Sequence, residues 1–313
     1  MGRVNRVAVM TSLAIASLSL ADTLWAFPIN SPNARTLFGG FALVAPRFRL
    51  TRATTLLQNG ERIDNPRDLE ATIFEEDLTV VYGATRDLTL GITVPAVQKR
   101  LRFLAPDGTH RELTNEGLGD LTLSGAYRFF RHDVPRGTTQ FSLLGALKLP
   151  TARSSQTDRN TPLLTGGNDL KLPKDLQLGS GSADGIFGVG AFQNFDRLSF
   201  YGDLQYKANS GANDFKMGNT FFYDFTADYV FFKSRNFFLV LELNGMVTEK
   251  AEARGRKVTD SGGHQIFISP GIVWLPIPQL ILEGSIQVPI LQNLNGTQLA
   301  PDFSIVFGAR YLF

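Results

Sequence analysis

Short segments in which apolar and polar residues alternate recur along most of this chain. Alternation of this kind places apolar side chains on one face of a β-strand and polar side chains on the other. Twelve such segments, separated by clusters of turn-forming residues, lie at residues 38–51, 69–82, 88–100, 118–130, 139–150, 184–193, 198–207, 219–232, 237–248, 265–275, 279–289 and 302–313. The sequence therefore predicts an all-β fold of about twelve antiparallel strands.

The connections between these segments alternate between two lengths. Every second connection is tight, at residues 83–87, 131–138, 194–197, 233–236 and 276–278. The others are long and polar, at residues 52–68, 101–117, 151–183, 208–218, 249–264 and 290–301. Barrels of the bacterial outer membrane have short periplasmic turns and long extracellular loops. We therefore predict a transmembrane up-and-down β-barrel that forms one domain over residues 27–313, with both of its ends in the periplasm.

The N-terminus has the features of an export signal. Arg3 and Arg6 precede an apolar run at residues 7–20, so we expect residues 1–26 to be cleaved off after Ala26. No later stretch approaches the ~18 consecutive apolar residues of a membrane-spanning helix. The chain has no cysteine, which excludes a disulfide framework and thiolate metal sites. Closure of the barrel should therefore hold this exported chain together, and we expect it to reside in the outer membrane.

Outward faces of the predicted strands are apolar, and their periplasmic ends carry aromatic residues. In the segment 237–248, Leu239, Leu241 and Leu243 alternate with Glu242 and Asn244. Aromatic rings favour the membrane interface, which predicts an interfacial role for Tyr82, Tyr127, Phe129, Phe192, Tyr229, Phe231, Trp274, Tyr311 and Phe313. A soluble β-sandwich would not sort its long loops to one end.

Several stretches resemble known outer-membrane proteins. The terminal Phe313, two residues after Tyr311, resembles the C-terminal signal that the barrel-assembly machinery recognises. Residues 87–95 (DLTLGITVP), 116–129 (EGLGDLTLSGAYRF), 268–290 (ISPGIVWLPIPQLILEGSIQVPI), 294–299 (LNGTQL) and 308–313 (GARYLF) resemble the family named for the MetA pathway of phenol degradation. That family is described as outer-membrane transporters, so the resemblance implies transport. The segment 151–183 matches nothing in it.

Charged residues at inward positions define the predicted lumen. The predicted lumen-lining residues are the cations Arg47, Arg49, Lys99, Arg128, Lys148, Lys207 and Arg310 and the anions Glu75, Asp77, Asp120, Asp203, Asp224, Asp228, Glu242 and Glu283. The two signs nearly cancel, whereas a charge-selective pore needs a ring of one sign. Twelve strands leave a narrow passage. We therefore expect a channel for small neutral or weakly polar solutes, including aromatic or hydrophobic ones, unless these charges only neutralise one another and keep the interior closed.

Other functions have weaker support in the sequence. A lipid hydrolase would need a serine beside a histidine, and His264 with Ser261 is the only pair at a suitable height. Asp158 and Asp169 lack calcium-loop spacing, and no helix pattern follows the glycines of residues 179–185. We expect no catalytic residues, metal or cofactor, and, with a net charge of only +2, no nucleic-acid partner. A structural or adhesive role for the barrel is a further alternative. Expected partners are outer-membrane lipid and lipopolysaccharide, the assembly machinery and a small solute.

Overall fold

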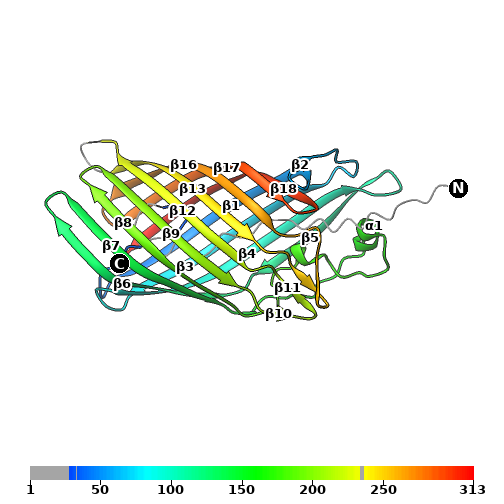
Figure 1. Ribbon diagram of the computed structural model, residues 1–313, viewed down its shortest axis with the longest axis horizontal. Coiled ribbons are helices and arrows are strands. Elements are labelled where there is room, and N and C mark those ends of the chain that lie inside the picture. The colour runs from blue at the N-terminus through cyan, green and yellow to red at the C-terminus, as the bar shows by residue number, and fades with distance from the viewer. Residues whose placement is uncertain (1–27, 33, 233–235) are drawn as a thin grey trace.

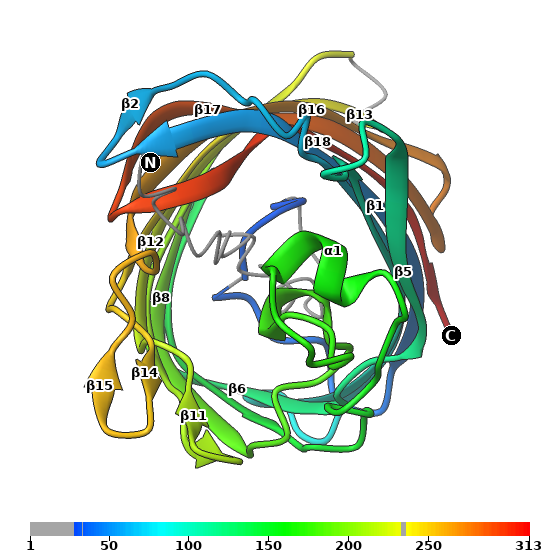
Figure 2. The same ribbon diagram turned by 90° about the vertical axis from the view of Figure 1, so that its right-hand side faces the viewer.

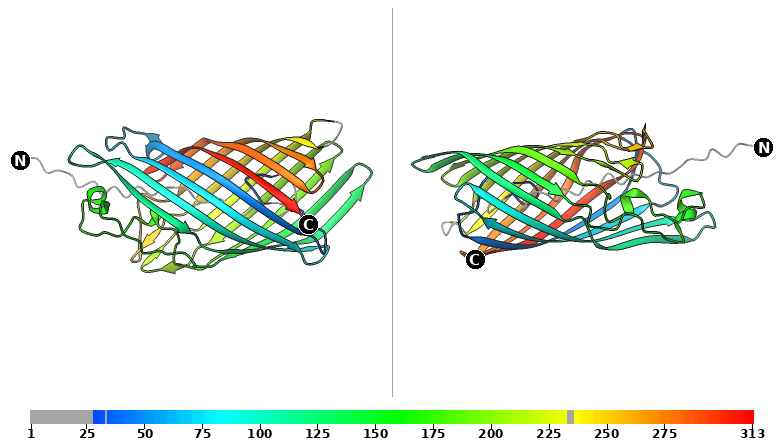
Figure 3. Two further views of the ribbon diagram at one scale, coloured as in Figure 1. Left: turned by 180° about the vertical axis from the view of Figure 1, so that it is seen from behind. Right: turned by 90° about the horizontal axis from the view of Figure 1, so that it is seen from below.

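The computed structural model describes residues 28–32, 34–232 and 236–313. The predicted export signal and most of the predicted turn at 233–236 lie outside these residues. Within them the chain forms a closed antiparallel barrel with twelve wall strands (Figures 1 and 3). Among the described residues, no helix has the length and hydrophobicity needed to cross a membrane. The predicted all-β barrel is confirmed.

The wall strands follow one another around the barrel in chain order. They are β1 (Ala42–Gln58), β3 (Glu70–Gly83), β4 (Leu88–Leu104), β5 (His110–Leu118) with β6 (Thr122–Val134), β7 (Gly137–Lys148), β8 (Asp184–Phe195), β9 (Leu198–Ala208), β12 (Thr220–Val230), β13 (Phe237–Thr248), β16 (Gly263–Ile277), β17 (Leu280–Leu294) and β18 (Thr297–Leu312). Short elements in the extracellular connections are β2 (Glu61–Arg62), α1 (Thr161–Thr165), η1 (Lys174–Leu176), β10 (Gly211–Ala212), β11 (Phe215–Lys216), β14 (Glu252–Ala253) and β15 (Arg256–Lys257).

The elements β5 and β6 together make one wall strand. Both pair with β4, β5 along its extracellular part and β6 along its periplasmic part. The register changes by one residue between the pairs Ala96–Leu118 and Thr93–Thr122. This β-bulge lies opposite Pro95, which has no N–H to donate, although the Pro95 carbonyl still accepts a 2.8 Å bond from the Gly119 N–H.

The barrel closes where β1 pairs with β18, from Leu43 opposite Leu312 to Gln58 opposite Thr297. At the periplasmic end Phe313 continues this pairing, since its N–H donates to the Ala42 carbonyl at 2.8 Å. Its ring is 67% exposed and packs against Tyr311, with ring centroids 4.8 Å apart. The last residue thus completes the seam that removes both sheet edges.

Deleting Phe313 should lower the amount of folded barrel in the outer membrane, because the seam loses its last backbone bond and its terminal aromatic ring. Heat-modifiable mobility on gels measures the folded fraction. Phe313→Tyr, which keeps the bond and an aromatic ring, is the matched control and should assemble normally. If deletion of Phe313 left assembly unchanged, the C-terminal residue would have no role as a signal.

The strands are longer than the sequence predicts at the extracellular end. The predicted loop 101–117 is largely strand, and strands also cover most of 290–301 and the start of 52–68. The added strand residues have polar outer faces because they lie above the hydrocarbon layer. The alternation of apolar and polar residues therefore ends before the strand ends. At the periplasmic end the first strand begins at Ala42 rather than at residue 38, since Gly40 adopts a φ of +88° and the chain turns there into the barrel.

The predicted faces agree with the observed exposure of the strands, with one exception. Leu239, Leu241 and Leu243 are 37–49% exposed on the lipid face, while Glu242 is buried inside. The prediction that Phe192 lies at the membrane interface is wrong. Phe192 faces inward and packs on Tyr201, with ring centroids 4.9 Å apart. The β8 residues on the outer face are Phe187, Val189 and Phe195.

Candidate substrate path through the barrel

Residues 28–32 and 34–37 lie inside the barrel, where they appear as the dark blue segment in Figure 2. The backbone N–H groups of Ile29 and Asn30 both donate to the carboxylate of Glu242 on β13, that of Asn30 at 2.9 Å. Two strands further round the same wall, the Asn30 amide donates to Ser285 Oγ on β17 at 3.0 Å. The Arg310 guanidinium on β18 donates to the Pro28 carbonyl at 3.0 Å. The start of this N-terminal segment is therefore held inside the lumen against β13, β17 and β18.

Residues 34–37 of the N-terminal segment are held by the opposite wall, so the segment crosses the lumen. Ser142 on β7 donates to the Ala34 carbonyl, and the N–H of Leu37 donates to Thr89 Oγ1 on β4 at 2.8 Å. The Arg35 guanidinium lies 4.9 Å from the centre of the inward Phe192 ring. Ile29 is fully buried in an apolar cluster with Val240 and Val273. The contacts combine polar and apolar groups, so the segment is bound at defined positions on the inner wall.

Most charges predicted to line the lumen do lie inside, and many pair with the opposite sign. Arg47 contacts Asp77 at 2.7 Å, and Arg310 contacts Glu283 at 2.7 Å. Lys148 contacts Asp120 at 2.7 Å and Asp184 at 3.0 Å. Arg49 stands directly across from Glu75 in the register of β1 and β3. The inner wall therefore carries no ring of one sign, as the near-equal counts predict.

Carboxylates collect on the opposite wall. Asp203 on β9 stands opposite Asp224 on β12, and Asp228 and Glu242 lie on the same inner face. Side-chain amides supply hydrogen bonds to two of these carboxylates: Gln205 donates to Asp203 at 2.7 Å and Asn244 donates to Asp224 at 3.0 Å.

Two further predicted cations occupy the ends of the barrel. Lys207 lies on β9 near the extracellular end. Arg128 is at the periplasmic rim, where it donates to Asp87 in the β3–β4 turn at 2.7 Å. Arg128 is therefore a turn contact at the rim, because the β4–β6 register, in which Tyr127 pairs with Leu88, places Arg128 opposite Asp87.

The connection between β7 and β8, residues 149–183, folds into the extracellular mouth rather than out into solvent. Figure 2 shows α1 inside the ring of strands on the side of β5. Leucines of this mouth loop pack on apolar residues of the inner wall, in a cluster that includes Leu164, Leu172, Leu176, Leu178, Ile73, Val97, Leu101, Phe103, Leu113 and Leu299. One side of the mouth is therefore lined by an apolar core, a feature that the predicted lumen of charges missed.

Cationic side chains of the wall and its connections hold the mouth loop by its carbonyl groups. Lys99 on β4 donates to the carbonyls of Asp175 and Gln177 at 2.9 and 2.8 Å. Arg67 donates to those of Leu163 and Leu164 at 2.7 and 2.6 Å, where cations stabilise a helix C-terminus. In the loop itself, burial lowers the pKa of the Lys174 ammonium, which stacks on the Phe215 ring at 5.2 Å.

An epitope tag inserted between Gly166 and Gly167, at the exposed tip of the mouth loop, should be labelled on intact cells. A tag between Arg136 and Gly137, in the β6–β7 turn, should be labelled only after the cells are opened. The two sites lie at opposite ends of the barrel, and the barrel's orientation fixes which of them faces the medium. The reverse labelling pattern would overturn the assigned orientation.

The histidine considered for lipid hydrolysis has a structural partner. His264 Nε2 lies 2.6 Å from the Tyr223 hydroxyl, and the Tyr223 ring covers Gly245 on the intervening strand. Ser261 donates instead to the Val258 carbonyl at 2.7 Å. The two residues proposed for a nucleophilic pair are thus engaged elsewhere, and the geometry does not favour a hydrolase.

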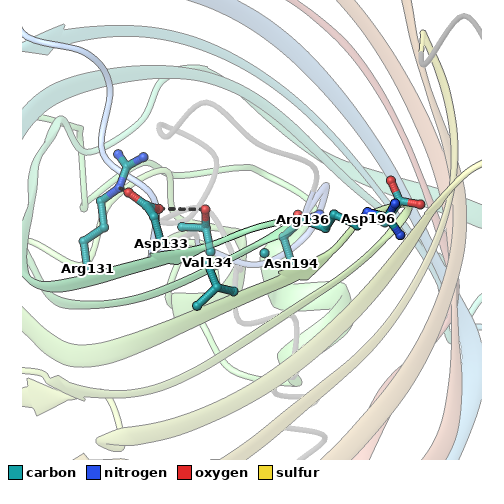
Figure 4. A pocket seen from close by; sticks show the side chains of 8 residues that line it. Arg131, Asp133, Val134, Arg136, Asn194 and Asp196 are labelled. Atoms are coloured by element: carbon teal, nitrogen blue, oxygen red, sulfur yellow. Dashed lines mark hydrogen bonds and ion pairs between the residues drawn. The ribbon is translucent and has the colours of Figure 1, made fainter.

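A groove of about 690 Å³ lies at the periplasmic tips, outside the lumen (Figure 4). Its lining residues come from the β6–β7 and β8–β9 hairpins: Arg131, Asp133, Val134, Arg136, Gly137, Thr138, Asn194 and Asp196. Asp133 accepts bonds from Arg131 and Thr138, each at 2.8 Å. The groove is open and lies at the hairpin tips, and its Arg131 pairs with Asp133, so we do not assign it to the substrate path.

Sequence reasoning missed that the N-terminal segment and the mouth loop lie inside the barrel. The N-terminal segment has no strand periodicity, and its binding depends on residues more than 200 positions away, such as Glu242 and Ser285. The mouth loop does contain a signal: Leu163, Leu164, Leu170, Leu172, Leu176 and Leu178 are too many leucines for a solvated loop.

The chain was compared with known families and structures. The family model described as "Putative MetA-pathway of phenol degradation" matches residues 67–293. The structure is similar to that of the COG4313 outer membrane channel from Pseudomonas putida F1, with 14% identity, a TM-score of 0.66 and coverage of 90% of this chain and 98% of that one. None of the curated proteins compared with the chain is significantly similar to it.

Two further structures are less similar to this one. The β domain of the Bordetella autotransporter BrkA has 9% identity and a TM-score of 0.47, covering 87% of this chain and 99% of that one. The toluene transporter TbuX from Ralstonia pickettii has 10% identity and a TM-score of 0.38, covering 88% of this chain and 90% of that one. The family match, by contrast, spans more than half of the sequence and includes the strands that carry most of the inner wall. Together with the closed barrel, it shows that this chain is an outer-membrane β-barrel that belongs to the family of the MetA pathway of phenol degradation.

Proposed function

We propose that this protein is an outer-membrane channel for small, neutral or weakly polar solutes, with aromatic and hydrophobic molecules among them. The observation that carries the proposal is the inner wall, which combines paired charges with an apolar mouth. A wall of this kind has no complete ring of one sign to select an ion, but it offers apolar surface to a small uncharged solute. The family description, which refers to phenol degradation, supports an aromatic solute, and the similarity to an outer-membrane channel supports a channel function.

Planar-bilayer recordings of the purified protein test the proposal. In a KCl gradient the reversal potential should lie near zero, because most inner-wall charges are paired and the carboxylates of β9, β12 and β13 are held by amide and backbone N–H groups. Phenol or toluene added to one side should reduce the ion current by occupying the lumen. Benzoate is the matched probe, since it has a similar ring but a full charge, and it should reduce the current much less.

Two results would contradict the proposed substrate class. A strong preference for one ion would show that the paired charges do not balance within the path. Equal block by phenol and benzoate would show that the channel does not distinguish neutral from charged solutes.

A further inference from the structure

Two extracellular connections, β9 to β12 and β13 to β16, together form a small second sheet. In this sheet β10 pairs with β11, β11 with β14, and β14 with β15. Lys216 stands opposite Glu252, and Glu252 opposite Lys257, so these three side chains share one face. Phe215, on the other face, contacts Lys174 of the mouth loop. Lys216 and Lys257 therefore face away from the mouth, and Figure 2 shows β14 and β15 outside the ring of wall strands.

The hairpin that contains β14 and β15, residues 250–257, concentrates positive charge. It carries the cations Lys250, Arg254, Arg256 and Lys257, with Glu252 as its only acid. Its net charge is therefore +3, whereas that of the whole chain is +2. Among the described residues, its one ion pair joins Lys257 to Glu252 at 3.8 Å, a separation at which solvent screens most of the attraction. We call this segment the basic hairpin.

Backbone bonds hold the basic hairpin in a defined position. The Ala251 N–H donates to Ser261 Oγ at 2.9 Å, and the Val258 N–H donates to the Ala251 carbonyl at 2.8 Å. At the tip, the Arg254 N–H donates to the Asp214 carbonyl at 2.8 Å. The cations are thus held near one another despite their mutual repulsion, which an anion bound among them would relieve.

The basic hairpin begins at the upper edge of the apolar belt. On this side the barrel wall ends with the pair of Thr220 and Thr248. The pair below it, Phe221 and Val247, faces lipid, and the two residues are 40% and 44% exposed. Lys250 follows Val247 by only three residues. The cations therefore lie at the level of the head groups of the outer leaflet, where lipopolysaccharide carries its phosphates.

Arginines on the outer face of β4 and β5 have a different environment. Arg102 stands between Glu70 and Glu112 in the register of β3, β4 and β5. Arg111 pairs with Asp107 at 3.2 Å. Acids beside these cations would repel a phosphate, so this part of the surface does not favour an anion.

We propose that the basic hairpin is a binding site for the phosphates of lipid A, the membrane anchor of lipopolysaccharide. Lipid A carries a phosphate at each end of its disaccharide, so it presents several negative charges at the height of the hairpin. Arginine suits such a ligand, because its planar guanidinium donates paired hydrogen bonds to phosphate oxygens. The site lies outside the barrel ring and is therefore separate from the solute path.

Titration of the purified, detergent-solubilised barrel with deep-rough lipopolysaccharide tests this proposal. A ligand that binds only the folded state raises the temperature at which the heat-modifiable band unfolds. The test variant removes three exposed cations by Arg254→Gln, Arg256→Gln and Lys257→Gln. The matched control removes three exposed arginines of β4 and β5 by Arg100→Gln, Arg102→Gln and Arg111→Gln.

The test variant should need about tenfold more lipopolysaccharide for half of the maximal rise, because it loses charge-assisted bonds to phosphate. The control should stay within about twofold of the unaltered protein, since acids neighbour its arginines. Added salt should weaken binding by the unaltered protein, because the hairpin is exposed. Heat-modifiable mobility without ligand shows that each variant is folded. Equal affinity of the test variant and the unaltered protein, or an equal loss in the control, would overturn the proposal.

Two further ligands identify the group that is bound. Lipid A stripped of its phosphates should raise the unfolding temperature much less than intact lipid A. Equal effects of the two would show that acyl chains, and not the cations, hold the lipid. Inorganic phosphate alone should have little effect. If it replaced lipopolysaccharide fully, the hairpin would be a site for a free anion and the assignment to lipid A would be wrong.

Conductance separates this site from the solute path. In planar bilayers of neutral lipid, the test variant should conduct as the unaltered protein does, because the hairpin lies outside the ring of strands. A changed conductance in the folded variant would contradict its placement outside the path.

Discussion

Leu241→Arg should abolish insertion of the barrel, whereas Glu242→Gln, at the neighbouring position, should leave it intact. Leu241 is 49% exposed on the lipid face of β13, while Glu242 is buried in the lumen. An arginine facing lipid near the midplane costs about 2–4 kcal/mol, a large fraction of the net stability of a folded domain. The folded, heat-modifiable fraction in the outer membrane measures the effect.

The two residues lie at nearly the same depth, so the comparison isolates the face of the strand from its position. Leu241→Ala is the control for lost side-chain volume and should insert normally. Glu242→Gln should fold but conduct better, because the amide has one acceptor oxygen where the carboxylate offers two to Ile29 and Asn30. Loss of insertion with Glu242→Gln and normal insertion with Leu241→Arg would mean that the assigned faces of β13 are reversed.

Deleting residues 28–36 should increase single-channel conductance several-fold. The described residues of this range cross the lumen and are anchored on β7, β13 and β17. The wall strands do not include them, so closure of β1 on β18 should persist. Planar-bilayer recordings of the refolded variant give the conductance, and heat-modifiable mobility gives the folded fraction.

A milder variant tests the same contact without shortening the chain. Asn30→Ala removes the bond to Ser285 and should give brief openings to the higher conductance. Thr54→Ala, whose hydroxyl bonds Asp302 near the extracellular end, removes a comparable hydroxyl bond away from the segment and should not. If the deletion variant conducts no better than the full chain, another element, such as the mouth loop, limits the current.

The sequence predicts the wall of this barrel much better than its contents. Lipid imposes a strict rule on every spanning residue, and therefore the period-two pattern alone places Leu241 outside and Glu242 inside. The rule ends where the membrane ends. For that reason the strands that continue through residues 101–104, 110–117 and 297–301 were predicted as loops.

Inside the barrel no comparable rule operates. Phe192 was predicted at the membrane interface because it is aromatic and ends a strand, yet it packs inward beneath Arg35. The alternation of residues predicts which charges are inward but not their partners, since the pairing of Arg310 with Glu283 depends on register across strands. Segments that fill the lumen bind through tertiary contacts and leave no periodic trace.

The seam between β1 and β18 also has a consequence for how the chain folds. Thr51 and Ser304 meet there at 2.8 Å although 253 positions separate them, so the first strand to be synthesised must await the last. Long-range pairing of this kind is slow, because the entropy of closing so large a loop is lost before any bond across the seam forms. Meanwhile both edge strands expose unpaired backbone groups that can aggregate. The Asn30 amide bonds Ser285 on β17, the strand next to β18, so the N-terminal segment can bind only after this part of the wall has formed. Binding of the segment inside the lumen should therefore be among the last events in the maturation of this barrel.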